Sequence, residues 1–242
     1  MAPDRFCFPG EIIPPDILPV PSKQSGKLKL GPGLFHTPPS TITTTLPGPL
    51  QVDLRKNAIW IEHNAGRYIP QPSDVIISTV HHSAADYYHC SITPHTSYAL
   101  LPHLAFEGAT KKTRPKLQPG SLVYARILKA DKDSETEMLC YNPSTGKSEG
   151  MGELKGGMLF DVSLAMARRL LMKGSEGCVV CLEELAEKLA FEIAVGRNGK
   201  VWVKSGGVRE TLIVGKALVE SDRRNLREEE QRKWVKTALK SM

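Results

Sequence analysis

The densest group of positive charges in the chain lies on a short segment around residue 112. Residues 105–129 contain six lysines or arginines and a single acid, Glu107. Glycine and proline keep the middle of this segment out of regular structure, so its cations are expected to project together. Such a group can neutralise the phosphates of a nucleic-acid strand, and the alternative is an ordinary solvated surface loop. The residues predicted to contact phosphates are Lys111, Lys112, Arg114, Lys116 and Arg126, the last of which either extends the path or forms a surface ion pair.

A second feature, Gly196-Arg197-Asn198-Gly199, supports two interpretations. A Gly-x-x-Gly sequence is typical of the loop with which KH domains hold an RNA backbone. The residues on both sides alternate as strands do, however, and Asn-Gly between two such runs is a strong hairpin signal. We therefore predict a structural turn with positive φ at Asn198 and Gly199, and a mostly buried Trp202 after it.

Another Gly-x-x-Gly sequence runs from Gly174 to Gly177, between two expected helices. This is the place where a KH domain has its RNA-holding loop. Glu176 puts a negative charge there, and a negative charge opposes the approach of phosphates. A plain helix–helix turn is therefore favoured, and contact of this loop with RNA stays open.

Three tyrosines, Tyr87, Tyr88 and Tyr98, fall on two expected strands in the middle of the chain. Successive side chains of a strand point to opposite faces. Either Tyr87 or Tyr88 can therefore offer a stacking surface while the other packs in the core, and the sequence leaves open which one does so.

Five of the seven histidines lie between residues 81 and 103, which raises the question of zinc. His81 and His82 are adjacent on an expected strand and should point in opposite directions, which spoils a shared ligand set. Cys178 and Cys181 form a Cys-x-x-Cys pair, but the βαβ setting of a redox site is absent, so core packing is expected. We predict no metal, no cofactor and, because no nucleophile–base or paired-carboxylate motif stands out, no enzymatic activity.

The overall composition narrows the class of partner. The chain has 242 residues, a formal net charge of +6 and a pI near 9.0, which favours a polyanion such as RNA or DNA. Its five scattered cysteines argue against a disulfide framework and favour a reducing compartment. The N-terminus lacks the pattern of a signal peptide, and no apolar run approaches bilayer length, so no membrane partner is expected.

These candidate residues are distributed over three expected domains of mixed β and α+β class. Residues 1–70 form an N-terminal β-rich domain, although 11 of the 18 prolines lie in the first fifty residues and a partly disordered arm is the alternative. Residues 71–147 hold five short strands, which suits an OB barrel. The five expected strands are 74–80, 86–93, 97–101, 121–129 and 137–141.

Residues 148–242 have the order strand, helix, helix, strand, strand, helix, with one further helix appended. This is the order of a eukaryotic-type KH domain, and Asp222 is expected to cap the appended helix.

Several segments together resemble a known family. Residues 105–115 and 120–125 are similar to segments of the RNA-binding cap proteins of the eukaryotic RNA exosome. The turn at residues 196–199 resembles the Gly-x-Asn-Gly signature of those caps. Residues 30–34 and 160–164 match as well, and the resemblance spans most of the chain.

The resemblance implies an OB domain of the ribosomal protein S-one kind beside a KH domain, with the Gly-x-Asn-Gly turn packed between them. It implies a non-catalytic subunit on a ring of ribonuclease PH-like subunits, next to other cap subunits. There the OB domains line the entry for single-stranded RNA that is degraded or processed from its 3′ end, ribosomal RNA included. Nucleus, nucleolus and cytoplasm are the implied locations. A free-standing RNA-binding adaptor in ribosome assembly or translation is the alternative.

Overall fold

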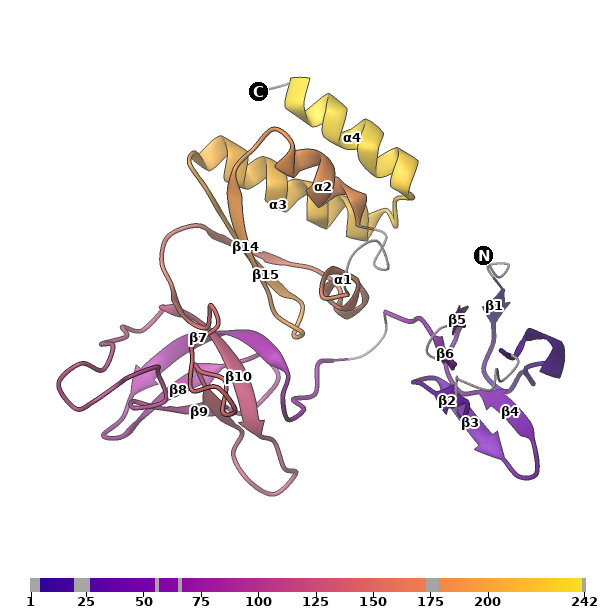
Figure 1. Cartoon of the computed structure of the whole chain (residues 1–242), viewed down its shortest axis with the longest axis horizontal. Helices are drawn as coiled ribbons and strands as arrows, with labels where there is room; N and C mark the ends of the chain where they lie inside the picture. Colours follow the sequence, from indigo (N-terminus) through magenta and orange to yellow (C-terminus); the bar gives the residue numbers. More distant parts are fainter. Residues whose placement is uncertain (1–4, 20–26, 55–56, 65–66, 173–178, 241–242) are drawn as a thin grey trace. The chain divides into compact units, whose positions relative to one another are not determined.

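The structure is a computed structural model that describes residues 5–19, 27–54, 57–64, 67–172 and 179–240 (Figure 1). It divides into two compact units, Met1–Ala65 and Gly66–Met242, while the three domain boundaries given above stay predictions. The Gly174–Gly177 turn and Cys178 lie outside the described residues. None of the helices in the described ranges is long and apolar enough to cross a membrane.

The N-terminal unit is β-rich, as predicted. Its larger sheet has the strand order β1 (Phe6–Cys7), β5 (Gly48–Asp53), β6 (Ala58–Ile61) and β2 (Lys29–Leu30). A separate hairpin joins β3 (Leu34–Thr37) to β4 (Thr41–Thr44), and one 3-10 turn, η1, covers Pro15–Ile17. Alternation buries one face of these strands, and the small core consists of Cys7, Ile13, Ile42, Leu50, Ile59 and Ile61.

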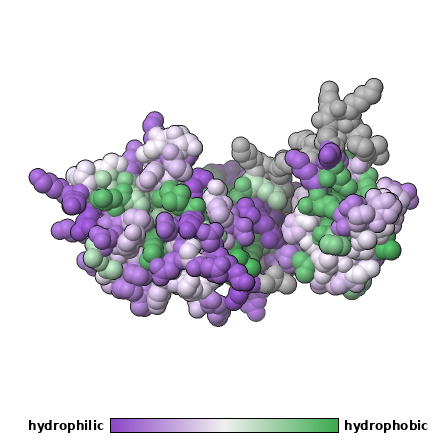
Figure 2. Space-filling model, turned by 90° about the horizontal axis from the view of Figure 1, so that it is seen from below, coloured by the Kyte–Doolittle hydropathy of each residue, from purple (hydrophilic) through white to green (hydrophobic). Residues whose placement is uncertain are grey.

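Apolar side chains also reach the surface of the N-terminal unit, where Figure 2 shows them in green. The aromatic members include Phe6, Phe8 and Phe35, which are more than half exposed. Phe6 and Phe8 lie side by side, with ring centroids 5.3 Å apart, and contiguous exposed apolar groups are typical of surfaces that contact another protein.

The second unit begins with a closed barrel of five strands, as predicted. They are β7 (Val75–Ser83), β8 (Tyr87–Ser91), β9 (Ala99–Pro102), β10 (Leu122–Lys129) and β11 (Glu137–Leu139). Strand β11 pairs with both β9 and β10, and this double pairing closes the sheet on itself. Closure leaves these strands without open edges, and alternate residues fill the interior.

The KH domain follows, in the predicted order. Strands β13 (Met158–Asp161), β15 (Lys200–Ser205) and β14 (Phe191–Val195) form an antiparallel sheet with β15 in the centre. Helices α1 (Leu164–Leu170), α2 (Val180–Ala186) and α3 (Val208–Arg223) cover one face of it, and α4 (Glu228–Lys240) packs on α2 and α3 (Figure 1). Cys181 is fully buried in this core, so core packing is confirmed for it. The short strand β12 (Gly152–Leu154) pairs with β10 of the barrel.

The prediction that Asp222 caps the last helix is wrong. Helix α3 continues through Asp222, because the apolar side of this helix stays buried as far as its last turn. The Asp222 carboxylate instead accepts hydrogen bonds from Ser163, from its N–H at 2.6 Å and from its hydroxyl. Ser163 is the N-cap of α1, so Asp222 fixes the start of the first helix rather than the last.

Residues 196–199 form the predicted hairpin turn between β14 and β15. The positive φ of Gly199, 78°, is confirmed, whereas the prediction of positive φ at Asn198 is wrong. The Gly196 N–H donates to the oxygen of Lys200 at 2.8 Å and the Gly199 N–H to the oxygen of Gly196 at 3.1 Å. These bonds enclose a three-residue loop, in which the last residue alone needs the left-handed conformation.

The Asn198 side chain connects this hairpin to the barrel. It is buried, and its Nδ2 donates to the backbone oxygens of Ile77 at 2.8 Å and Ile92 at 2.9 Å. Its Oδ1 accepts from the Ile77 N–H at 3.3 Å. A Cβ on Gly196 would lie 2.7 Å from the same nitrogen, so a glycine is needed for this close approach.

Trp202 follows on β15 and is 5% exposed, as predicted. Its Nε1–H donates to the Gly156 oxygen at 2.7 Å, and its ring packs near Ile77 and Ala194. The turn and Trp202 therefore make one buried joint between the barrel and the KH sheet.

We expect Asn198→Ala to lower the free energy of unfolding by about 2–4 kcal/mol, because it leaves three buried backbone groups without their partner. Asn198→Asp should cost more, since a carboxylate cannot donate to the two carbonyl oxygens. Chemical denaturation of the full chain measures both. Asn142→Ala is the matched control, because its side chain bonds within an exposed loop. Equal losses in Asn198→Ala and Asn142→Ala would contradict the importance of the joint.

Candidate nucleic-acid interface

The predicted phosphate contacts lie mostly on the long connection from β9 to β10. We call residues 108–116 the basic loop. Lys111, Lys112 and Lys116 are exposed on it, whereas Arg114 is half-buried. The loop has internal order, because the Thr110 oxygen accepts from the N–H groups of Thr113 at 3.1 Å and Arg114 at 2.9 Å. The lysines thus project into solvent from a folded turn.

Arg114 is held against the end of the barrel by a histidine. Its Nη1–H donates to Nδ1 of His103 at 2.7 Å, and Nε2 of His103 lies 3.3 Å from the Ser83 hydroxyl. Burial, and then the positive charge of Arg114, lowers the pKa of His103. The neutral imidazole can therefore accept from Arg114 while its other nitrogen bonds Ser83. The sequence did not single out His103, since nothing in its spacing distinguishes it from the other histidines.

Tyr88 is the buried member of the tyrosine pair, and it also anchors the basic loop. It is 4% exposed, while Tyr87 is 40% exposed. The Tyr88 hydroxyl donates to the Pro115 oxygen at 2.8 Å and accepts from the Leu117 N–H at 3.2 Å. Its ring lies 4.2 Å from that of His103. Side chains from the barrel interior therefore set the position of the loop that carries the lysines.

The structure does not bring Arg126 together with the basic loop. Arg126 lies on β10 opposite Val75, the first residue of β7, whereas the loop is anchored beside Ser83, the last residue of β7. At the usual rise per strand residue, these two ends are about 25 Å apart. Arg126 instead shares a face of β10 with Tyr124, whose hydroxyl donates to the Val195 oxygen of the KH sheet at 3.2 Å. Contact of Arg126 with RNA stays a prediction, as do those of the loop residues.

A group of rings covers the outer surface of the barrel near the end of β7. The prediction that His81 and His82 point in opposite directions is wrong, because their Nδ1 atoms are 3.0 Å apart. A β-bulge explains the difference: the pairing of β7 with β8 shifts between Val80 and His82, so His81 is an extra residue. Strand alternation alone cannot reveal such a bulge.

The ring of His82 stacks on that of His89 at 4.2 Å, and Tyr98 lies 4.7 Å from His81. We call His81, His82, His89 and Tyr98 the ring cluster. Within the described ranges, no three histidine, cysteine or acidic side chains are placed to hold a metal ion.

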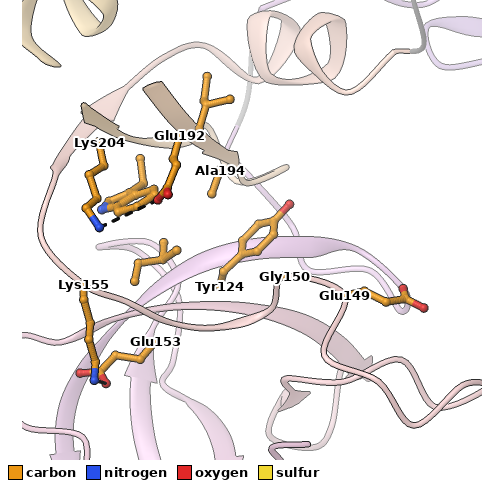
Figure 3. A pocket seen from close by; sticks show the side chains of 11 residues that line it. Tyr124, Glu149, Gly150, Glu153, Lys155, Glu192, Ala194 and Lys204 are labelled. Carbon is orange, nitrogen blue, oxygen red and sulfur yellow. Dashed lines mark ion pairs between the residues drawn. The ribbon is translucent and has the colours of Figure 1, made fainter. Parts of the chain in front are cut away.

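A cavity of about 500 Å³ lies between the barrel and the uncovered face of the KH sheet (Figure 3). Tyr124 and Trp202 belong to its apolar part, and charged side chains of both signs line the rest. Lys155 is 3.4 Å from Glu153, and Lys204 is 4.0 Å from Glu192. The carboxylates disfavour an RNA phosphate here, so the basic loop and the ring cluster are the better candidate surface.

Comparison with known protein families covers most of the chain. Residues 28–67 match the model described as Exosome complex exonuclease Rrp40 N-terminal domain, and residues 68–152 match Exosome complex component RRP40, S1 domain. Residues 157–209 match a KH domain model. A crystal structure described as "putative exosome complex RNA-binding protein" has the same fold, with a TM-score of 0.57 and 21% identity over 72% of this chain and 97% of that one.

Curated relatives extend the similarity to nearly the full length. Exosome complex component rrp40 of Schizosaccharomyces pombe is 37% identical over 241 residues, which cover 98% of this chain and 95% of the relative. Exosome complex component RRP40 of Saccharomyces cerevisiae is 36% identical, over 91% of this chain and 90% of the relative. The Drosophila melanogaster protein of the same name is 40% identical over 81% of each chain. This chain, with its S1-type barrel joined to a KH domain, belongs to the RRP40 family of exosome complex components.

Proposed function

We propose that this chain is a non-catalytic subunit of the RNA exosome that guides single-stranded RNA toward the nuclease for degradation and processing, ribosomal RNA included. The observation that carries this proposal is the basic loop, whose exposed lysines project from a turn anchored to the barrel by Arg114 and Tyr88. An anchored group of cations can hold phosphates at little cost in loop ordering.

The family suggests the partners. Its members are exosome components by name, so ribonuclease PH-like ring subunits and neighbouring cap subunits are the partners we propose. The exposed apolar side chains of the N-terminal unit support a protein contact of this kind. Nucleus, nucleolus and cytoplasm are the locations we propose.

The mode of RNA binding follows from the chemistry of the loop. Lysine ammonium groups neutralise phosphates as point charges and do not read base edges. The proposed subunit therefore accepts RNA of any sequence, which suits a subunit that delivers RNA to a nuclease. Arg114 has a double role in this scheme: one N–H group holds His103, and the others remain able to meet a phosphate.

Lys111→Ala with Lys112→Ala should make RNA binding less dependent on salt. Each lost phosphate contact lowers the slope of log K against log salt by about 0.7 for a single strand. Fluorescence anisotropy with a labelled oligouridine at four salt concentrations measures the slope. Lys132→Ala with Lys147→Ala, two lysines exposed elsewhere on the barrel's loops, removes the same charge and is the control. An equal change of slope in the two double variants would contradict the proposed path.

The free chain should not degrade RNA. Nuclease chemistry needs converging metal ligands or an activated nucleophile, and no such motif stands out in the sequence. End-labelled single-stranded RNA incubated with the purified chain and Mg²⁺ is therefore expected to stay intact, while the assembled exosome shortens it from the 3′ end. A degrading activity that persists through purification and disappears on substitution of one carboxylate of this chain would overturn the non-catalytic assignment.

A further inference from the structure

The ring cluster is not explained by the barrel's own stability. Its four rings come from three places in the sequence, β7, β8 and the connection before β9, and meet on the outer surface. His81, His82 and Tyr98 are exposed, and His89 is half-buried. The buried core contains Val80, Tyr88 and Cys90 instead, on the opposite side of the same strands.

The arrangement suits a flat, unpaired base. His82 and His89 are nearly parallel, at 10°, and Tyr98 approaches both His81, at 4.7 Å, and His82, at 6.1 Å. Aromatic rings on the outer strands of a barrel of this kind stack bases without selecting their sequence. Tyr87, exposed on β8 one residue before Tyr88, lies on the same strand as His89 and can lengthen this surface.

Three imidazoles in contact also respond to protons. The pKa of His82 is lowered by partial burial first, and then by the charges of His89 and His81. The titratable groups of the cluster are thus the two histidines of β7, His89 of β8 and the Tyr98 phenol. Next to His82 in the chain, the Ser83 hydroxyl bonds His103, and His103 in turn binds Arg114. The charge of Asp86 also acts on His103 and favours its protonation. Repulsion from the two neighbouring imidazoles opposes protonation of His82, and a bound phosphate would relieve that repulsion.

The cluster and the anchor of the basic loop lie at the same end of β7. His82 is followed by Ser83, whose hydroxyl is 3.3 Å from Nε2 of His103, and His103 binds Arg114 at 2.7 Å. One RNA strand can therefore touch the lysines and then the rings without crossing a carboxylate-lined cavity. A protein ligand is less well matched, since the surface offers rings and cations, the groups that bind bases and phosphates.

We propose that the ring cluster is a nucleotide subsite for single-stranded RNA, in which a base stacks on the rings and the adjacent phosphate pairs with protonated imidazole. The subsite rests on the proposed function, since it extends the RNA path from the basic loop. Binding at this subsite takes up protons, so affinity rises as the pH falls below neutral.

The test compares RNA affinity at about pH 7.5 and about pH 6 at fixed salt, with the full chain and a labelled oligouridine. We expect the wild type to bind about three- to tenfold more tightly at the lower pH, since one linked proton gives at most tenfold per pH unit. His82→Gln with His89→Gln should lose most of this ratio. His95→Gln, an exposed histidine of the same barrel, should keep it. Lys111→Ala with Lys112→Ala should weaken binding at both pH values and leave the ratio unchanged.

A second measurement uses the wild-type chain, so it does not depend on whether the variants fold. Imidazole signals of the wild-type chain, followed by NMR during RNA titration, should shift for the cluster histidines and not for His95. If the double variant His82→Gln with His89→Gln binds RNA tightly and keeps the pH ratio, the subsite is overturned. The same follows if RNA binds tightly to the wild type without shifting the cluster signals. Either result leaves the basic loop as the proposed RNA contact. Absence of RNA binding at both pH values, in the free chain and the assembled exosome, would overturn the proposed function itself.

Discussion

The amide side chain of Asn198 is the constraint on which the second unit depends. It supplies two donors and one acceptor, and the backbone of the barrel presents the matching two oxygens and one nitrogen. A buried amide that satisfies three buried backbone groups fixes both distance and orientation, because each bond fails if the hairpin shifts or turns. Gly196 makes this possible by allowing the two backbones to approach. The uncovered face of the KH sheet is thereby held against the barrel, and Trp202 packs between them beside Ile77 and Ala194.

Much of this fold could be predicted from local patterns. The barrel strands alternate clearly, and the Asn-Gly pair marked the hairpin. The turn type could not be predicted, because it depends on a third loop residue, Arg197, whose N–H donates to the Val75 oxygen of the barrel at 2.9 Å. Asp222 was misassigned for a related reason: its partner Ser163 lies 59 residues earlier in the chain. Contacts between residues so far apart in the sequence cannot be inferred from the spacing of neighbouring residues.

The candidate site was likewise only partly predictable from the local sequence. Charge density drew attention to the segment after residue 105, but it grouped cations that the fold separates. A regular strand carries Arg126 away toward the KH sheet, and a buried histidine holds Arg114. Local sequence therefore finds the loop with its lysines, whereas the role of each arginine depends on which barrel residue it meets.

The bulge at His81 also determines how this surface tolerates changes in chain length. Val80 opposes Cys90 and His82 opposes His89, so His81 between them is the extra residue of the bulge. Loss of one residue at the bulge would leave β7 and β8 paired without interruption, and the barrel core could keep its composition. If His81 were the residue lost, its ring and its 4.7 Å contact with Tyr98 would disappear, whereas His82 would still oppose His89. The bulge thus lets two adjacent residues of β7 place their rings on the same outer surface, which regular alternation would not allow.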